Sequence, residues 1–170
     1  ADFPLINIEK GQFRPKFGAS WPAVMVEPRV SLLNGGFRFN VVPPEAGAEV
    51  LGLRGADITP LCAGVERQCG AVFSVTDMVG GARIRCVGKN AHAASPDDGI
   101  NAIQALLTLL AALPLAECAS TKAIRSMVKL FPLGDTRGKA LGIAQGDESG
   151  ELTLNLALMT LSETGFSAQF

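Results

Sequence analysis

The sequence holds one histidine, one tryptophan and no tyrosine among its 170 residues. Basic residues number 15 and acidic residues 16, so the formal net charge is −1. Because there is no basic excess, nothing in the charge favours binding to nucleic acid or to an anionic membrane surface. The most apolar run, residues 100–115, is interrupted by polar side chains and by Pro114, so it is too short and too polar to span a bilayer.

The four cysteines, Cys62, Cys69, Cys86 and Cys118, form no Cys-x-x-Cys pair. A structural zinc site needs Cys or His ligands in close pairs, so the sequence predicts no metal ligands in this chain. Cys62 and Cys69 are two helical turns apart, which places them on one face of a helix. We interpret the cysteines as buried, reduced thiols, which indicates a cytoplasmic protein.

The spacing of apolar residues predicts three helices and several strands, in one domain or two small fused ones. The expected helices cover residues 57–69, 96–113 and 117–130, and the expected strands cover residues 5–8, 24–33, 37–42, 48–53, 71–76, 82–87, 152–161 and 165–170. Residues 13–22 and 132–150 are interpreted as connections. Hairpins mixed with helices predict an α+β fold, a two-layer sandwich of antiparallel sheets with helices packed on one face.

The run Asn34-Gly35-Gly36 predicts a hairpin turn that leads into the strand over residues 37–42, because Asn-Gly favours tight hairpin turns. In that strand Asn40 would point away from Phe39 and Val41. Its carboxamide can donate to and accept from a polar ligand. The alternative is an ordinary asparagine that faces solvent.

The single histidine, His92, lies in the run GKNAHAASPDDGINA over residues 88–102. Ser95 is predicted to cap a helix, with Pro96 at its first position and Asp98 completing a capping box. A loop held so firmly can direct an imidazole at a ligand, where it could donate to a developing oxyanion. The alternative is a loop histidine that bonds a backbone carbonyl. No Ser-His-Asp order or carboxylate pair completes a catalytic set within the chain.

The run around His92 resembles the G-x-x-A-H-(A/G)-x-x-P-x-x-G-x-N-A signature of the zinc-dependent aminoacylase, acetylornithine deacetylase, succinyl-diaminopimelate desuccinylase and carboxypeptidase superfamily. Three further segments resemble its bacterial dipeptidase branch (PepV-like). They are residues 1–11, the G-G-x-x-x-N-x-V-P element at residues 35–43, and the D-x-x-G-x-x-L-G-I and G-x-L-T-x-N runs within residues 135–155. The resemblance therefore covers nearly the whole chain.

This resemblance implies the lid domain of a zinc dipeptidase, a domain that the family inserts into its zinc-bearing catalytic domain. It implies that His92 stabilises the tetrahedral oxyanion and that Asn40 helps to hold the substrate. The zinc ligands and the general base would lie in the catalytic domain, and the arginine that binds the substrate carboxylate would follow Phe170. Residues 1–22 would connect from the absent catalytic domain, and residues 23–170 would form the lid, with two similar ferredoxin-like α/β halves.

The implied parent enzyme is a cytoplasmic metallopeptidase that hydrolyses short peptides. Many relatives dimerise through this domain, but the double lid of the dipeptidase branch implies a monomeric parent. The partners of the chain would then be its own catalytic domain and a dipeptide substrate, and the isolated chain would be inactive. The alternative is a non-enzymatic α+β module for amino-acid binding or subunit association. Because the sequence begins with Ala1 and its last strand looks cut short, we expect a piece of a longer polypeptide.

Overall fold

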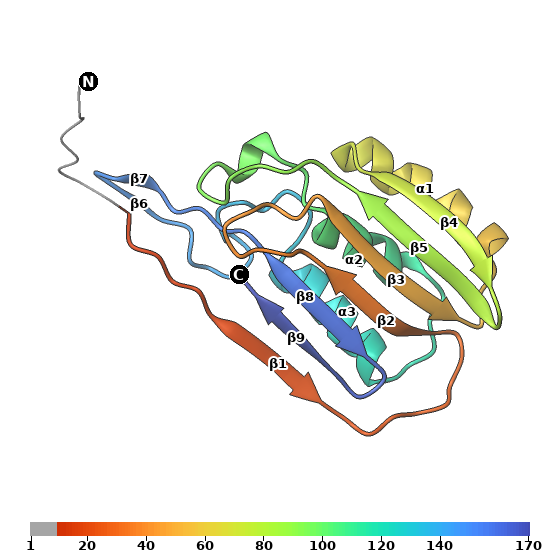
Figure 1. Cartoon of the computed structure of the whole chain (residues 1–170). Helices are drawn as coiled ribbons and strands as arrows, with labels where there is room; N and C mark the ends of the chain where they lie inside the picture. Colours follow the sequence, from red (N-terminus) through yellow and green to blue (C-terminus); the bar gives the residue numbers. More distant parts are fainter. Residues whose placement is uncertain (1–9) are drawn as a thin grey trace.

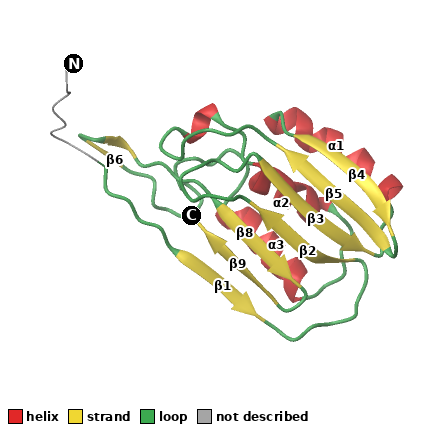
Figure 2. Ribbon diagram, viewed as in Figure 1, coloured by secondary structure: helices red, strands yellow, loops and turns green. Residues whose placement is uncertain are grey.

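Seven strands form one antiparallel sheet, and three helices cover one of its faces (Figures 1 and 2). The computed structural model describes residues 10–170. The strands of this sheet are β1 Lys16–Ser20, β2 Arg29–Gly35, β3 Glu45–Leu51, β4 Val72–Met78, β5 Gly81–Val87, β8 Leu158–Ser162 and β9 Gly165–Gln169. Their order across the sheet is β1-β9-β8-β2-β3-β5-β4. The predicted α+β class, with helices on one face of an antiparallel sheet, is confirmed.

The helices share the buried core with the inner face of the sheet. They are α1 Gly55–Cys69, α2 Ala102–Ala112 and α3 Ala119–Leu130, with a short 3-10 helix at Pro96–Asp98. A separate ribbon of two short strands, β6 Gly146–Asp147 and β7 Gly150–Glu151, projects from the connection that follows α3. The predicted strands at 71–76 and 82–87 correspond to β4 and β5, and the predicted stop at Gly70 is confirmed by its left-handed φ of 75°.

The predicted hairpin at Asn34-Gly35-Gly36 is wrong. After β2 the chain runs through an irregular loop over residues 36–44, and β3 is the strand that returns beside β2. Two consecutive prolines, Pro43 and Pro44, lack the N–H groups that a ladder needs, so pairing resumes only after them. Asn40 therefore lies on a loop and not on a strand.

The segment expected to be a connection, residues 13–22, contains the edge strand β1. This strand pairs with β9 from Lys16 opposite Gln169 to Ser20 opposite Gly165. One aromatic side chain anchors it, since the ring of Phe17 packs against Phe131, Phe166 and Phe170 at centroid distances of 5.9–6.1 Å. The strand predicted at residues 5–8 lies outside the described residues.

The predicted helix over residues 96–113 begins later than expected, and Ser95 is not the cap of α2. Ile100 exchanges backbone hydrogen bonds with Lys89, at 2.8 and 3.0 Å, which keeps the chain extended until Asn101. The Asn101 side chain then caps α2 by accepting from the N–H groups of Ile103 and Gln104. This helix is buried on nearly every side because it lies between α1, α3 and the sheet.

The predicted strand over residues 152–161 is only partly correct, because its first half joins no strand of the sheet. The N–H of Leu152 donates to the carbonyl of Gln145, and that of Leu154 donates to the carbonyl of Thr136. These bonds attach the segment to the connection that follows α3, so only β8 enters the sheet.

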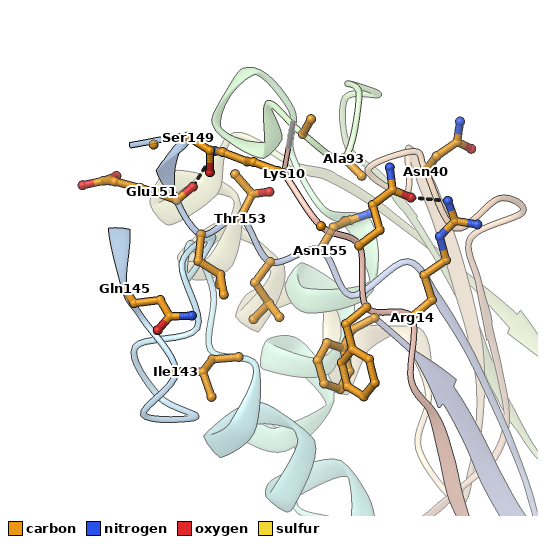
Figure 3. Close-up of a pocket in the computed structure, with 18 of the residues that line it drawn as sticks. Lys10, Arg14, Asn40, Ala93, Ile143, Gln145, Ser149, Glu151, Thr153 and Asn155 are labelled. Carbon is orange, nitrogen blue, oxygen red and sulfur yellow. Dashed lines mark hydrogen bonds between the residues drawn. The ribbon is translucent and has the colours of Figure 1, made fainter. Parts of the chain in front are cut away.

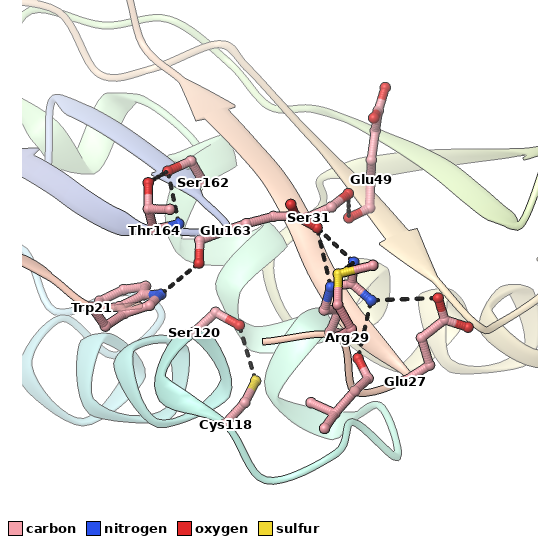
Figure 4. Close-up of polar contacts among 12 residues, drawn as sticks. Trp21, Glu27, Arg29, Ser31, Glu49, Cys118, Ser120, Ser162, Glu163 and Thr164 are labelled. Atoms are coloured by element: carbon pink, nitrogen blue, oxygen red, sulfur yellow. Dashed lines mark hydrogen bonds and ion pairs between the residues drawn. The ribbon is translucent and has the colours of Figure 1, made fainter. Parts of the chain in front are cut away.

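A buried arginine ties the β8–β9 turn to the start of β2 (Figure 4). Arg29 is 4% exposed, and its guanidinium donates to the Glu163 carboxylate at 2.6 Å and to the Val26 carbonyl at 3.1 Å. The Trp21 indole donates to the Glu163 carbonyl at 3.0 Å. A buried charge is tolerated when it is paired in this way, and loss of one partner would be strongly destabilising.

Strand β5, which lies next to the edge strand β4, turns the thiol of Cys86 into the core. Burial, followed by the neighbouring Cys69 and Cys62, raises the pKa of this thiol to about 12. At pH 8 roughly one molecule in ten thousand would carry the thiolate, which is the nucleophilic form. We therefore expect iodoacetamide to leave Cys86 unmodified in the folded protein at pH 8 and to modify it after denaturation in guanidinium chloride, as measured by mass spectrometry of peptides. Modification of folded Cys86 as fast as that of half-buried Cys69 would contradict this expectation.

Candidate functional site

Four loop segments converge at one end of the sheet, where β2 and β5 end and β3 and β8 begin. In an antiparallel sheet the end of one strand lies beside the start of its neighbour, so the loops attached to these strand ends lie close together. They enclose a cavity of ≈ 480 Å³. Its lining comes from residues 10–14, 39–40, 92–94, 143, 145–147 and 149–155, with Phe170. Figure 3 shows Asn40 and Arg14 on one side of this cavity and Gln145 and Ile143 on the other.

The two predicted site residues, His92 and Asn40, lie side by side at this cavity. The N–H of Ala93 donates to the Asn40 carbonyl at 3.0 Å, and the N–H of Val42 donates to the Ala91 carbonyl at 2.9 Å. Val41 stands opposite His92 in an isolated antiparallel bridge. These contacts form a short ladder between residues 40–42 and 91–93, which brings together two exposed side chains that are far apart in the sequence.

The His92 ring accepts a hydrogen bond at Nδ1 from the N–H of Ala94, at 3.1 Å. A ring nitrogen that accepts carries no proton, so in the neutral imidazole the proton lies on Nε2. The alternative in which the ring donates to a backbone carbonyl is not the arrangement found here. The loop therefore selects the tautomer in which Nε2 is a hydrogen-bond donor.

Two glycines of the histidine run allow close backbone contacts that brace the loop. A Cβ at Gly88 would collide with the carbonyl of Ile100, and a Cβ at Gly99 would lie 2.9 Å from the carbonyl oxygen of Lys89. Both contacts belong to the bridge that delays the start of α2. The glycines are therefore needed for the path of the loop that carries His92.

An ion-pair network joins the opposite wall of the cavity to the histidine loop. The Arg137 guanidinium donates to Glu151 at 3.0 Å and also pairs with Asp97 of the 3-10 helix. The hydrogen bonds to Glu151 and Asp97 raise the pKa of Arg137. The Thr136 hydroxyl and then Arg137 lower the pKa of the Asp97 carboxyl, so both partners stay charged at neutral pH.

The base of the same wall is organised by Asp135. Its carboxylate accepts from the N–H groups of Arg137 at 3.2 Å, Lys139 at 3.1 Å and Ala140 at 2.8 Å. Partial burial alone would raise the pKa of this carboxyl, but the backbone donors outweigh burial and lower it. The ionised carboxylate thus orders the turn that carries the chain toward β6.

The N-terminal segment closes a third side of the cavity. The Arg14 guanidinium lies over the ring of Phe39, 3.7 Å from its centroid, and the Lys10 ammonium donates to the Glu151 carbonyl at 2.6 Å. With Asp147 also in the lining, the cavity carries charged groups of both signs. Sequence reasoning did not place Arg14 or Lys10 at the site, because no local pattern links a charged residue to a loop so distant in the chain.

Within residues 10–170, no group of three or more His, Cys, Asp or Glu side chains is arranged to hold a metal ion. The zinc implied by the family resemblance therefore has no matching ligand set in this part of the chain. None of the helices described here is long and apolar enough to cross a membrane.

Residues 77–157, the region that contains the histidine loop, match the family described as "Peptidase dimerisation domain". This match and the likeness to the relative below agree with the resemblance to a peptidase lid domain that was found in the sequence. Over 166 residues the chain is 33% identical to "Putative dipeptidase YtjP" of Bacillus subtilis (strain 168). The alignment covers 96% of this chain and 35% of that protein, so the chain spans about a third of the length of this relative.

Replacing Asp135 tests how the cavity wall is held. Because its folded pKa is lowered, Asp135 contributes stability that is present above its unfolded pKa and is lost as pH falls through the folded pKa. We expect Asp135→Asn to lower the free energy of unfolding by about 1 kcal/mol at pH 7, and this deficit to shrink below about pH 4. Urea denaturation at several pH values measures it.

The matched control is Glu148→Gln, which removes one negative charge from an exposed position in the same connection. This variant should show neither the loss in the free energy of unfolding nor its dependence on pH. A deficit for Asp135→Asn that stays constant from pH 7 to pH 3 would contradict the role of the ionised carboxylate.

Proposed function

We propose that this chain is the lid of a zinc-dependent dipeptidase, in which His92 stabilises the oxyanion formed during hydrolysis of a short peptide. The observation that carries the proposal is the hydrogen bond from Ala94 to Nδ1 of His92, which leaves Nε2–H as a donor at the cavity. Asn40, held beside it by the ladder, would hold the substrate through its carboxamide.

Peptide hydrolysis needs a donor at the carbonyl oxygen. When water attacks the carbonyl carbon, the electron pair of the C=O bond moves to oxygen, and a preorganised donor stabilises the resulting negative charge. His92 would supply that donor through Nε2–H. The zinc and the general base would be held by the catalytic domain, because no ligand group is found among residues 10–170.

The size of the cavity supports a small substrate. Its volume of ≈ 480 Å³ lies within the range of about 300–1,000 Å³ that is usual for small-molecule sites. Charged groups of both signs in its lining suit a short peptide, which carries a terminal ammonium and a terminal carboxylate. The printed name of the Bacillus subtilis relative, a dipeptidase, agrees with this substrate class.

We also propose the domain organisation that the family resemblance implies. Residues 1–22 would lead in from the catalytic domain, with β1 adding an edge strand as the chain enters the lid. A helix is followed by a hairpin of the main sheet twice, as α1 with β4–β5 and, after the β6–β7 ribbon, as α3 with β8–β9. This repetition supports two similar halves and a monomeric parent. Four free thiols suit a cytoplasmic location.

Subunit association is the second candidate function, and the family description favours it. Among residues 10–170, no strand pairs with the outer edge of β4, and its Val72 side chain is 61% exposed. An unpaired edge can add a strand from a second copy. The size of the full-length protein in solution distinguishes this candidate from the monomeric parent.

In the full-length parent enzyme, His92→Ala should lower kcat by roughly 10²–10³, because one oxyanion donor is worth that much, while zinc content stays unchanged. Steady-state kinetics on a dipeptide and metal analysis measure the two quantities. Asn90→Ala, at an exposed position in the same loop, is the control and should retain full turnover. Unchanged turnover in His92→Ala would reject the oxyanion role.

For Asn40 the expected effect falls mainly on binding. Asn40→Ala should raise KM several-fold and change kcat less, because a contact made equally in the bound substrate and in the transition state affects KM alone. A fall in kcat with KM unchanged would instead place Asn40 in the stabilisation of the transition state.

A further inference from the structure

We propose that Asn155 and Asn101 form a positioning link that aims the His92–Asn40 pair from the N-terminus of α2. The inference rests on the proposed function for its catalytic consequence, but the link itself is visible in the contacts. Asn155 is 9% exposed, and its Nδ2 donates to the Val41 carbonyl at 2.9 Å. Val41 lies opposite His92 in the ladder and next to Asn40 in the chain.

The second half of the link connects Asn155 to the core. Asn101 Nδ2 donates to Asn155 Oδ1 at 3.3 Å and to the Leu156 carbonyl at 2.9 Å. Asn101 Oδ1 meanwhile accepts from the N–H groups of Ile103 and Gln104 and so caps α2. The most buried helix of the domain is thereby joined through two carboxamides to the loop that carries Asn40.

The chemistry at position 155 requires a carboxamide. This side chain must donate to a carbonyl and accept from an amide at the same time, which Asn does and Asp or Leu cannot do. With both ends engaged, Asn155 is a positioning residue that acts through Val41, although it also lines the cavity (Figure 3).

Precise placement of this loop matters for the proposed reaction. An oxyanion donor acts over 2.7–3.1 Å, so small displacements lose much of its effect. The backbone of residues 40–42 is outside the sheet, and the ladder with 91–93 joins one loop to another. The hydrogen bonds of Asn155 and Asn101 attach this pair of loops to α2, which is a rigid element of the core.

Hydrogen exchange measured by NMR on the 170-residue chain tests the link without reference to catalysis. In Asn155→Asp the amides of Val42 and Ala93, which form the ladder, should exchange roughly 10-fold faster or more, while core amides of α2 such as Leu107 stay unchanged. Asn90→Asp, the same chemical change at an exposed position in the histidine loop, should alter neither set.

Asn101→Asp separates the link from the cap. Its carboxylate retains the acceptor that caps α2 but loses the donors to Asn155 and Leu156, so the ladder amides should again exchange faster while the helix stays protected. If Asn155→Asp does not fold, this variant decides the question. Unchanged ladder amides, or an equal rise in every amide including those of α2, would overturn the proposal.

Kinetics of the full-length enzyme then test the consequence for catalysis. Asn155→Asp should lower kcat about 10-fold or more, and the double variant with His92→Ala should be no slower than His92→Ala alone, because both changes remove the same contribution. If the fold-losses in kcat of the two single variants instead multiply in the double variant, Asn155 has a merely structural role, and the proposal that it positions His92 is rejected. If His92→Ala itself leaves turnover unchanged, the proposed function fails, and hydrogen exchange still judges the link separately.

Discussion

The short ladder between residues 40–42 and 91–93 is the contact on which the candidate site depends. Each segment follows a different strand of the sheet, and the ladder fixes the two segments relative to each other. Through this ladder the exposed side chains of Asn40 and His92 share one cavity. The glycine at position 88 and the bridge between Lys89 and Ile100 hold the second segment close to the start of α2.

Partnered polar groups extend this organisation from the core to the cavity. Across residues 10–170, no buried side-chain nitrogen or oxygen lacks a hydrogen-bond partner. Arg29 connects the β8–β9 turn to β2, and Asn155 connects the α2 cap to the Val41 carbonyl. Because an unpaired buried polar group is costly, each such group restricts the loops to the arrangement that satisfies it. The domain thereby holds its loop residues against a rigid base.

Sequence reasoning worked best where local rules decide the structure. The spacing of apolar residues predicted β4 and β5, and Gly70 marked the end of α1. It failed where partners distant in the chain decide. The glycine pair at 35–36 suggested a hairpin, but the strand that returns beside β2 is β3, which begins only after Pro43 and Pro44. Lys89 holds Ile100 in an extended conformation, so α2 begins only after Asn101. Phe17 recruits β1 into the sheet through aromatic rings that no local pattern reveals.

The sequence by itself determined the α+β class and the resemblance of the histidine run to a peptidase lid, because strand alternation, helical spacing and a motif of neighbouring residues are all local properties. It also selected His92 and Asn40, but only as separate candidates. Only the tertiary structure decided that these two residues share a cavity, that Nδ1 of the imidazole accepts from Ala94, and that Asn155 supports their loop. The physical reason is that hydrogen bonds between distant segments depend on the packing of the whole sheet and its helices, which a local pattern does not encode.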